Sequence, residues 1–478
     1  MKAERTGILL KPDASRVLLS PFKPPNAEQM FTRIISLTDV EVSNEINLIL
    51  EEFGNRHRDL QKYFLQRYKQ VEQSILNDTS LSENRKKLIG AYLTSEYSIE
   101  SAALFNPCIV WHPDQTKLLE GSKRFILTLR ATGEGHISSI VFHTGIIEKN
   151  GTINMLAPSK FVTIPDDVSN INIEKVYVKK LFNDLGIDKD IANKILNKLR
   201  TNFLSSDLEK QIAIVNNKIP HKDLNRIKLK RVLSTVRSNY LVSYSSDKDI
   251  SEQIIFPYGP TEVNGIEDAR FVQFLKEDGS FTYYATYTAY DGHLIQPQLI
   301  ETPDFVNYTV STLHGPEVKN KGMAIFPKKI NGMYATLSRQ DGENLYIMFS
   351  NNILLWDSKQ ILLKPKFEWE LVQIGNCGSP IETEKGWLVL SHGVGAMRKY
   401  SIGAFLLDLK DPSKVIGRLK EPLISPEENE REGYVPNVVY SCGSIVYRDE
   451  LIIPYAMSDS ASSFAKVNLD ELLTELTS

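Results

Sequence analysis

A strand–turn–strand unit occurs five times along the chain, and this repeat limits the possible folds more than any other feature. The turns are residues 121–123, 278–280, 331–332, 385–386 and 449–450, and an apolar strand follows each of them. The second, third and fourth turns begin at residues 278, 331 and 385, so they lie 53 and 54 residues apart. Such a period is typical of propeller blades, whereas a β-sandwich, the main competing fold, does not explain it. The sequence therefore predicts a mainly β protein, a five-bladed β-propeller.

Two stretches with helical periodicity interrupt the β pattern. Between about residues 39 and 101, apolar side chains recur at spacings of three and four, with charged side chains opposite them. Within this stretch, Ser80 and Glu83 fit the S-x-x-E capping box of a helix. The second stretch covers about residues 171–238, and we expect it to be an insertion in the first blade.

The expected organisation follows from these patterns. Residues 1–25 contain four prolines and are expected to be irregular. An irregular and helical segment, residues 1–104, should precede the catalytic propeller, residues 105–478, and a short helix should close the chain.

The composition excludes several classes of protein. With 56 Lys+Arg against 59 Asp+Glu, the net charge of −3 gives no electrostatic reason to expect nucleic acid or an anionic membrane as a partner. The N-terminus lacks the apolar region of a secretory signal, and no apolar run is long enough to span a membrane. The widely spaced cysteines argue against a disulfide framework and a zinc site, and the histidines form no metal-binding pattern. We expect a cytoplasmic protein without a metal. The residues concerned are Cys108, Cys377 and Cys442, and His57, His112, His221, His293 and His314.

Polar side chains recur at equivalent positions of the five units. In an antiparallel hairpin, the start of the first strand and the end of the second lie at the same end. Blades related by rotation would bring all these positions to one end of a central channel, where convergent polar groups form the usual ligand site. The strand starts are Asn106, Asp268, Lys321, Asn376 and Asn437. The strand ends are Arg130, residues 287–290, Arg339, His392 and, slightly later, Asp459.

The side chains in this ring indicate glycosyl transfer. Asp268, in the stretch NGIEDARF, begins a strand and is the expected catalytic acid, since glycosyl transfer needs a proton donor for the leaving oxygen. An inverting hydrolase also needs a second carboxylate about 6.5–9.5 Å away, whereas a phosphorylase needs cations to hold phosphate. Glu267 and Tyr287 are expected to contact the sugar. The cationic group of Lys321, Arg339, His392 and Arg398, with Tyr400 nearby, favours phosphorolysis.

The chain resembles glycoside hydrolase family 130, the mannoside phosphorylases and related β-mannosidases, from about residue 105 to residue 466. The resemblance rests on an ordered set of motifs and implies a five-bladed β-propeller. The motifs are FNP, LRATGEGHISSI, GIEDARF, TYTAYDG, KGMAIFPKKINGMYATLSR, GSPIETEKGWLVLSHGV, YSIGA, GYVPNVVYSCG and PYAMSD.

The resemblance also implies roles for individual residues. Asp268 matches the general acid, which protonates the glycosidic oxygen through the 3-hydroxyl of the transferred mannose. Asn106, Arg130 and Asp459 match residues that hold this mannose. The positions that match phosphate ligands are Lys321, Arg339, His392 and Tyr400.

Three residues depart from the family pattern. Ala269 stands where proline is usual, and Lys321 and Gln373 stand where many phosphorylases have arginine and lysine. Lysine keeps the charge without the arginine fork, and glutamine loses the charge.

The sequence thus predicts an inverting β-mannoside phosphorylase that releases α-mannose 1-phosphate and uses inorganic phosphate as co-substrate, with no cofactor. The alternatives are an inverting β-mannosidase with a glutamate base and, from another class, a non-catalytic glycan-binding propeller. The expected partners are a small oligosaccharide and phosphate, and a homo-oligomer could form through the helical segments.

Overall fold

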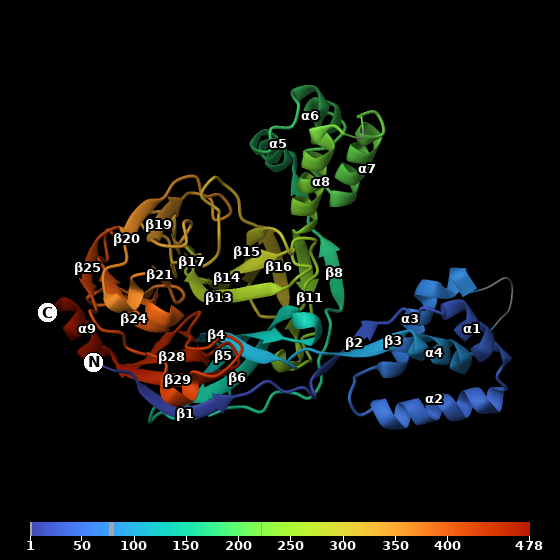
Figure 1. The fold of residues 1–478 in the computed structure, drawn as a ribbon, viewed down its shortest axis with the longest axis horizontal. Coiled ribbons are helices and arrows are strands. Elements are labelled where there is room, and N and C mark those ends of the chain that lie inside the picture. The colour runs from blue at the N-terminus through green and yellow to red at the C-terminus, as the bar shows by residue number, and fades with distance from the viewer. Residues whose placement is uncertain (1, 76–80, 221) are drawn as a thin grey trace.

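Antiparallel β-sheets make up most of the chain in the computed structural model, which describes residues 2–75, 81–220 and 222–478. Within these ranges, five sheets contain four or more strands, and two further pairs of short strands stand apart from them. The predicted mainly β fold is therefore confirmed. The five larger sheets gather in the main body of the molecule, and the two helical groups project from it (Figure 1).

Each larger sheet contains the strand that was predicted after one of the repeated turns. The first sheet is β12 (Ile254–Ile255), β6 (Ser138–Ile147), β5 (Lys123–Thr132) and β4 (Ala103–Trp111), with β7 (Ile153–Met155) beside β6. The second is β13 (Ile266–Leu275), β14 (Phe281–Tyr290), β15 (Ile295–Thr302), β16 (Asn307–Thr312), β11 (Tyr240–Ser243) and β8 (Asp167–Asn170). The third is β17 (Ala324–Ile325), β18 (Tyr334–Ser338), β19 (Leu345–Ser350) and β20 (Gln360–Leu363).

The last two sheets contain the C-terminal strands. The fourth is β21 (Gln373–Asn376), β23 (Gly386–Val394), β24 (Tyr400–Leu407) and β25 (Val415–Arg418), with β22 (Ile381–Thr383) beside β23. The fifth is β1 (Glu4–Leu10), β29 (Ala461–Asn468), β28 (Glu450–Met457) and β26 (Val439–Tyr440), with β27 (Ile445–Tyr447) beside β28. Helix α9 (Leu469–Thr477) follows β29. Short 3₁₀ helices also lie in the loops: η1 (Glu134–His136), η2 (Ile250–Glu252), η3 (Glu368–Glu370), η4 (Ala396–Arg398) and η5 (Glu428–Glu430).

The prediction that residues 1–25 are irregular was wrong. Strand β1 pairs with β29, and β2 (Val17–Pro21) pairs with β3 (Thr94–Ser98), which lies inside the stretch predicted to be helical. Pro12 lies between the two strands, Pro21 ends β2, and Pro24 and Pro25 follow it, so the prolines interrupt neither strand. The partner strands are far away in the sequence, and no local pattern signals such pairing.

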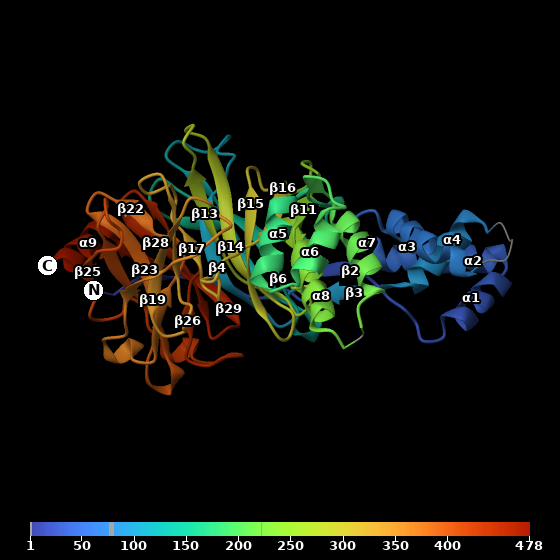
Figure 2. The ribbon, with the colours of Figure 1, turned by 90° about the horizontal axis from the view of Figure 1, so that it is seen from above.

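The N-terminal helices pack into a group of their own at one end of the molecule (Figure 2). Thr38 and Glu41 form a capping box at the start of α2, and Ser82 caps α4 by accepting a hydrogen bond from the backbone N–H of Arg85. The predicted capping residue Ser80 lies outside the described residues. The helices are α1 (Ala27–Ser36), α2 (Asp39–Phe53), α3 (Leu60–Ile75) and α4 (Glu83–Tyr92).

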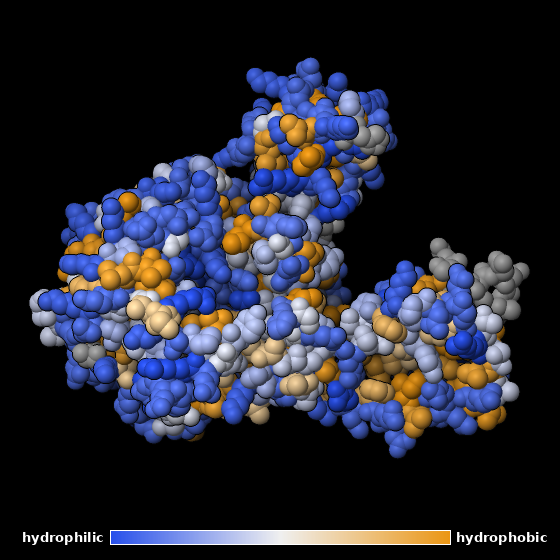
Figure 3. Space-filling model, viewed as in Figure 1, coloured by the Kyte–Doolittle hydropathy of each residue, from blue (hydrophilic) through white to orange (hydrophobic). Residues whose placement is uncertain are grey.

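A groove of about 470 Å³ lies on this helical group, lined mainly by apolar side chains that include Phe22, Ile49, Phe53 and Phe64. Hydrophobic side chains reach the surface of the same group in Figure 3. Oligomer formation through the helical segments stays a prediction.

The sequence placed the second helical stretch in the first blade. Along the chain it falls between β7 and β12, which both belong to the first sheet, but the strands directly beside it belong to the second sheet. Strands β8 and β11 flank it, and they pair with each other at the edge of the second sheet, which also contains β13. The insertion separates the two strands of this edge pair in the sequence. The order of the chain alone therefore does not reveal that β8 and β11 join the second sheet. The insertion contains β9 (Ile173–Glu174), α5 (Lys175–Asp184), α6 (Lys189–Leu196), β10 (Asn202–Phe203), α7 (Ser205–Asn216) and α8 (Leu224–Arg237), packed around a small core of their own.

Helix α5 holds this insertion against the loop between β16 and β17. The rings of Tyr177 and His314, which lies in that loop, are 4.5 Å apart. Lys180 Nζ also lies 3.8 Å from Oδ1 of Asp357, in the loop between β19 and β20. The loop between β16 and β17 also carries Lys321, so the insertion is anchored to the segment that delivers a predicted site residue.

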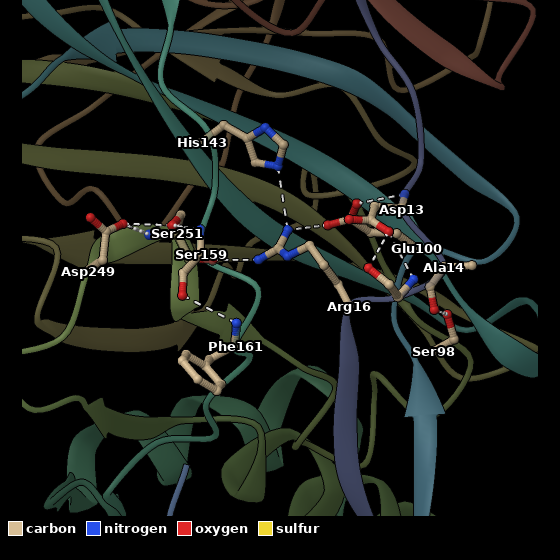
Figure 4. A network of polar contacts seen from close by, with 11 residues as sticks. Asp13, Ala14, Arg16, Ser98, Glu100, His143, Ser159, Phe161, Asp249 and Ser251 are labelled. Atoms are coloured by element: carbon tan, nitrogen blue, oxygen red, sulfur yellow. Dashed lines mark hydrogen bonds and ion pairs between the residues drawn. The ribbon is translucent and has the colours of Figure 1, made fainter. Parts of the chain in front are cut away.

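A buried ion pair ties the N-terminal segment to the sheets. The Arg16 guanidinium donates hydrogen bonds to Glu100 and to the Ser251 carbonyl, and its Nη1 lies 3.4 Å from His143 Nε2 (Figure 4). Both charged side chains of the pair are 1% exposed. Burial and the adjacent Arg16 lower the pKa of His143 to about 3, so this imidazole is neutral. No helix in the described ranges is long and apolar enough to cross a membrane.

Candidate active site

An unusual backbone conformation recurs at the predicted strand starts. Asp268, Asn106 and Asn437 have φ values of 55°, 48° and 63°, in the left-handed region that Asn and Asp tolerate better than most residues. The strand pairing shifts register around Asp268 and Asn106, as at a β-bulge. A bulge re-aims side chains, so these positions share a backbone geometry that takes them out of the regular alternation of the strands.

Two carboxylates and two cations meet around β13. Arg130 Nη2 lies 2.9 Å from Glu267 Oε1, and Arg130 Nη1 lies 3.6 Å from Asp268 Oδ1. Lys321 Nζ lies 3.3 Å from the other oxygen of Glu267. The structure therefore brings together four of the residues that were predicted from three different units.

Arg270 is a further cation beneath this group, and sequence reasoning did not assign it to the site. Its guanidinium donates to the Asp268 carbonyl at 2.9 Å and to the Tyr440 hydroxyl at 2.6 Å. Arg270 is 1% exposed, so its charge acts on Asp268 with little screening by water. Its position two residues after Asp268 could have indicated that Arg270 belongs to the site, whereas nothing in the sequence indicates the role of Tyr440.

Arg339 fits between two glycines that leave room for it. A Cβ on Gly322 would lie 2.8 Å from Arg339 Nε, and a Cβ on Gly375 would lie 3.1 Å from Arg339 Cδ and 2.3 Å from His392 Cε1. Gln373, in the amide orientation that satisfies both of its groups, accepts from Arg339 Nη1 at 3.0 Å and donates to Gly342 O at 3.1 Å. Glutamine at this position thus orients Arg339 without adding a charge.

His392 is enclosed beside Arg339. Its ring stacks on Tyr400 at 5.9 Å and contacts the Tyr440 ring at 4.9 Å, and its Nδ1 lies 3.1 Å from the Asn376 carbonyl oxygen. Burial, with the charges of Arg339 and Arg270, holds the pKa of His392 well below its usual value. The imidazole is therefore neutral and is not one of the cations, contrary to the prediction from the sequence.

Buried polar atoms without a hydrogen-bond partner in the described part of the chain concentrate around this group. Buried polar atoms in proteins are nearly always paired, so a local excess of unpaired ones indicates a place where a ligand binds. Asn376 contributes both atoms of its side-chain amide, a signal that only the structure reveals. The unpaired atoms that belong to this group are Asn106 Oδ1, Arg130 Nε, Arg270 Nε, Arg339 Nε, Asn376 Oδ1, Asn376 Nδ2 and His392 Nε2.

The carboxyl groups of Asp268 and Asp459 differ in pKa. Burial raises the pKa of Asp268, but the surrounding cations, led by Lys321 and Arg270, outweigh burial and lower it. Burial, followed by the nearby charge of Asp268, raises the pKa of Asp459 to about 6. Two neighbouring acids with separated pKa values can hold one proton between them, which is the usual arrangement for acid–base catalysis.

The Asp459→Asn variant is expected to be more stable than the wild type in neutral and alkaline buffer. The raised pKa means that the ionised carboxylate is disfavoured in the folded protein, so the wild type loses stability as the pH rises through about 6. The gain should be about 1–2 kcal/mol at alkaline pH and should vanish below about pH 4, where the carboxyl group is protonated in both states. Thermal unfolding of both proteins across this range measures it. A gain that does not change with pH would contradict the pKa assignment.

Two predicted residues have different surroundings from the rest. Tyr287 lies in the core at 2% exposure, and its hydroxyl donates to the buried Glu262, so the structure does not bring it into the group around Asp268. The face of a strand on which a tyrosine lies depends on register, which the sequence did not fix. Tyr400 reaches the group through its contact with His392.

The described residues contain no group of three or more His, Cys, Asp or Glu that could hold a metal ion, and His221 lies outside them. The three cysteines are free and buried. The side chains that meet at the site carry carboxyl groups, cations and amides.

Comparisons with known proteins agree with this chemistry. The profile of the family described as β-1,4-mannooligosaccharide phosphorylase matches residues 225–477, more than half of the chain. A 1,2-β-oligomannan phosphorylase of Thermoanaerobacter sp. (strain X514) is 37% identical over 217 residues, which cover 44% of this chain and 71% of that protein. A β-1,2-mannobiose phosphorylase of Listeria innocua is 32% identical over 235 residues, 46% of this chain and 63% of that protein.

The solved structure of a β-1,2-mannobiose phosphorylase from Listeria innocua aligns with 80% of this chain and 93% of its own, at 24% identity and a TM-score of 0.48. The family match and the 37% identical relative, most of whose length is aligned, establish the relationship. This chain belongs to glycoside hydrolase family 130.

Proposed function

We propose that the protein is an inverting phosphorylase that cleaves β-mannosides and releases α-mannose 1-phosphate. The observation that carries the proposal is the excess of cations beside Asp268. Arg339, whose charge acts on Asp268, forms no ion pair with a carboxylate in the ranges that the structure describes, and Lys321 shares Glu267 with Arg130. An anion such as phosphate would balance this charge, and arginine forks bind phosphate oxygens in pairs.

The alternative of a β-mannosidase is less well supported. An inverting hydrolase needs a free carboxylate to activate water. Glu267 is held by Arg130 and Lys321, so its carboxylate is not free to activate water. A non-catalytic glycan-binding protein would not need the unpaired cations.

The charges also suggest how phosphate and the acid act together. In the free protein the cations keep the pKa of Asp268 low, so this carboxyl group is ionised and cannot donate a proton. Phosphate bound at Lys321 and Arg339 would offset two of these cations and raise the pKa of Asp268 towards that of a general acid. Phosphate would then attack the anomeric carbon from the opposite face while Asp268 protonates the glycosidic oxygen through the 3-hydroxyl of mannose.

The remaining roles follow the same proposal. Asn106, Arg130 and Asp459 would hold the transferred mannose, and His392 and Tyr400 would complete the phosphate site with the two cations. We propose that the five sheets surround one axis as a five-bladed propeller, because the strand starts of several sheets meet at Asp268. A cytoplasmic location and a reaction without a cofactor belong to the same proposal.

A product assay tests the proposed function. The protein is incubated with β-mannobioses of each linkage, with and without phosphate, and mannose 1-phosphate and mannose are measured. We expect mannose 1-phosphate only in the presence of phosphate and little free mannose. Mannose released at the same rate without phosphate would establish the hydrolase instead, and no product from any linkage would favour the glycan-binding protein.

A further inference from the structure

The protonation of His392 follows from its surroundings. Its Nδ1 lies 3.1 Å from the Asn376 carbonyl oxygen, which can only accept a hydrogen bond, so Nδ1 must carry a proton. Strand pairing of Gly375 with His392 fixes the distance between β21 and β23, and the rings of Tyr400 and Tyr440 both pack against the imidazole. The tautomer is thereby fixed by the backbone.

The other nitrogen of the ring is left as a hydrogen-bond acceptor. His392 is 0% exposed, and its Nε2 has no partner among the residues that the structure describes. A second proton would create a buried imidazolium beside Arg339 and Arg270, and no carboxylate hydrogen-bonds to the ring to compensate it. Nε2 therefore carries no proton, and its lone pair can accept a hydrogen bond.

Arg339 lies next to this acceptor. A Cβ added to Gly375 would lie 2.8 Å from His392 Nε2 and 3.1 Å from Arg339 Cδ. Both side chains therefore pack over the same glycine. Arg339 offers only donors, whereas His392 offers only an acceptor at this point. A ligand that satisfies both needs an oxygen that accepts from Arg339 and a protonated oxygen that donates to His392, and an anion would also balance the guanidinium charge.

We propose that His392 Nε2 accepts a hydrogen bond from the protonated oxygen of hydrogenphosphate, while Arg339 binds its unprotonated oxygens, so that the site selects oxyanions that carry a proton. Phosphate and arsenate meet this requirement, and sulfate does not, because it has no proton at neutral pH. Sulfate would leave a buried acceptor unpaired and facing a negative charge. The inference rests on the proposed phosphate site and adds the reason for its choice of anion.

Calorimetric titration with phosphate, arsenate and sulfate, at constant ionic strength in mildly alkaline buffer, tests the selectivity. The wild type should bind phosphate and arsenate with a Kd at least about 10-fold lower than that of sulfate, given the usual penalty for an unpaired buried acceptor. In His392→Asn the side-chain amide can donate or accept, so this ratio should fall towards one. In the matched control Arg339→Lys, both anions should bind more weakly and the ratio should be kept. Equal affinity of the wild type for sulfate and phosphate would overturn the proposal.

Nitrogen NMR of the wild type, with ¹⁵N-labelled histidine, tests the inference without any variant. A variant that folds poorly therefore cannot affect this result. The His392 signals should be those of a neutral ring protonated on Nδ1, and phosphate but not sulfate should shift the Nε2 signal. A protonated Nε2 in the free protein would disprove the inference. Mannose 1-phosphate formation with no preference for phosphate over sulfate would reject this inference alone, whereas selective phosphate binding without phosphorolysis would reject the proposed function alone.

Discussion

Asp268→Asn should reduce kcat for phosphorolysis by about 10²–10⁴-fold, the range that general acids contribute. Asparagine matches aspartate in size and keeps an oxygen for the substrate hydroxyl, but it cannot transfer a proton. The variant also removes the negative charge that Arg130 and Arg270 surround. The rate of mannose 1-phosphate release at saturating phosphate and mannoside measures the effect.

Binding must be measured in parallel, because a loss of affinity would imitate a loss of catalysis. Calorimetry should show that Asp268→Asn still binds the mannoside, and it should bind phosphate at least as well as the wild type, since one negative charge near the anion is gone. Asp278→Asn is a matched control on an exposed turn and should leave kcat unchanged. An Asp268→Asn protein that works within about tenfold of the wild-type rate would show that another group is the acid.

Arg16→Met should lower the free energy of unfolding by about 3–5 kcal/mol, which is the usual cost of removing one partner from a buried ion pair. Methionine fills much of the arginine volume but leaves the Glu100 carboxylate buried without its cation. Chemical denaturation of the two proteins, followed by tryptophan fluorescence and circular dichroism, measures the difference.

The double variant Arg16→Met/Glu100→Gln should recover part of this loss, because it removes both buried charges together. Arg237→Met provides the matched control: Arg237 is 52% exposed where it pairs with Glu209, and its replacement should cost less than about 1 kcal/mol. Equal losses in Arg16→Met and Arg237→Met would show that the buried pair does not anchor the N-terminal segment.

The sequence predicts best those features that depend on neighbouring residues. The strands after the turns at residues 278–280 and 331–332 were found because a turn and an alternating or apolar run lie side by side in the chain. The Asn331–Gly332 turn adopts φ values of 50° and 80°, as its composition requires. The meeting of Arg130, Asp268 and Lys321 was predicted because a repeated unit places equivalent strand ends together.

Features that depend on distant partners were missed. Strand β1 has no local mark of its pairing, and the edge pair of β8 and β11 is separated by the helical insertion. The neutral state of His392 depends on burial beside two guanidinium groups, which no spacing in the sequence reveals. The unpaired amide of Asn376 likewise becomes visible only when its neighbours are known.

The pairing of β1 with β29 has a consequence for biosynthesis. Residues 4–10 leave the ribosome long before their partner, residues 461–468, has been made. The fifth sheet therefore cannot be completed co-translationally until residues 461–468 have emerged, and β1 exposes an unpaired edge during that time. Contacts over such a sequence distance slow folding, so a circular permutant that joins these two strands by a short hairpin should acquire its native sheet sooner.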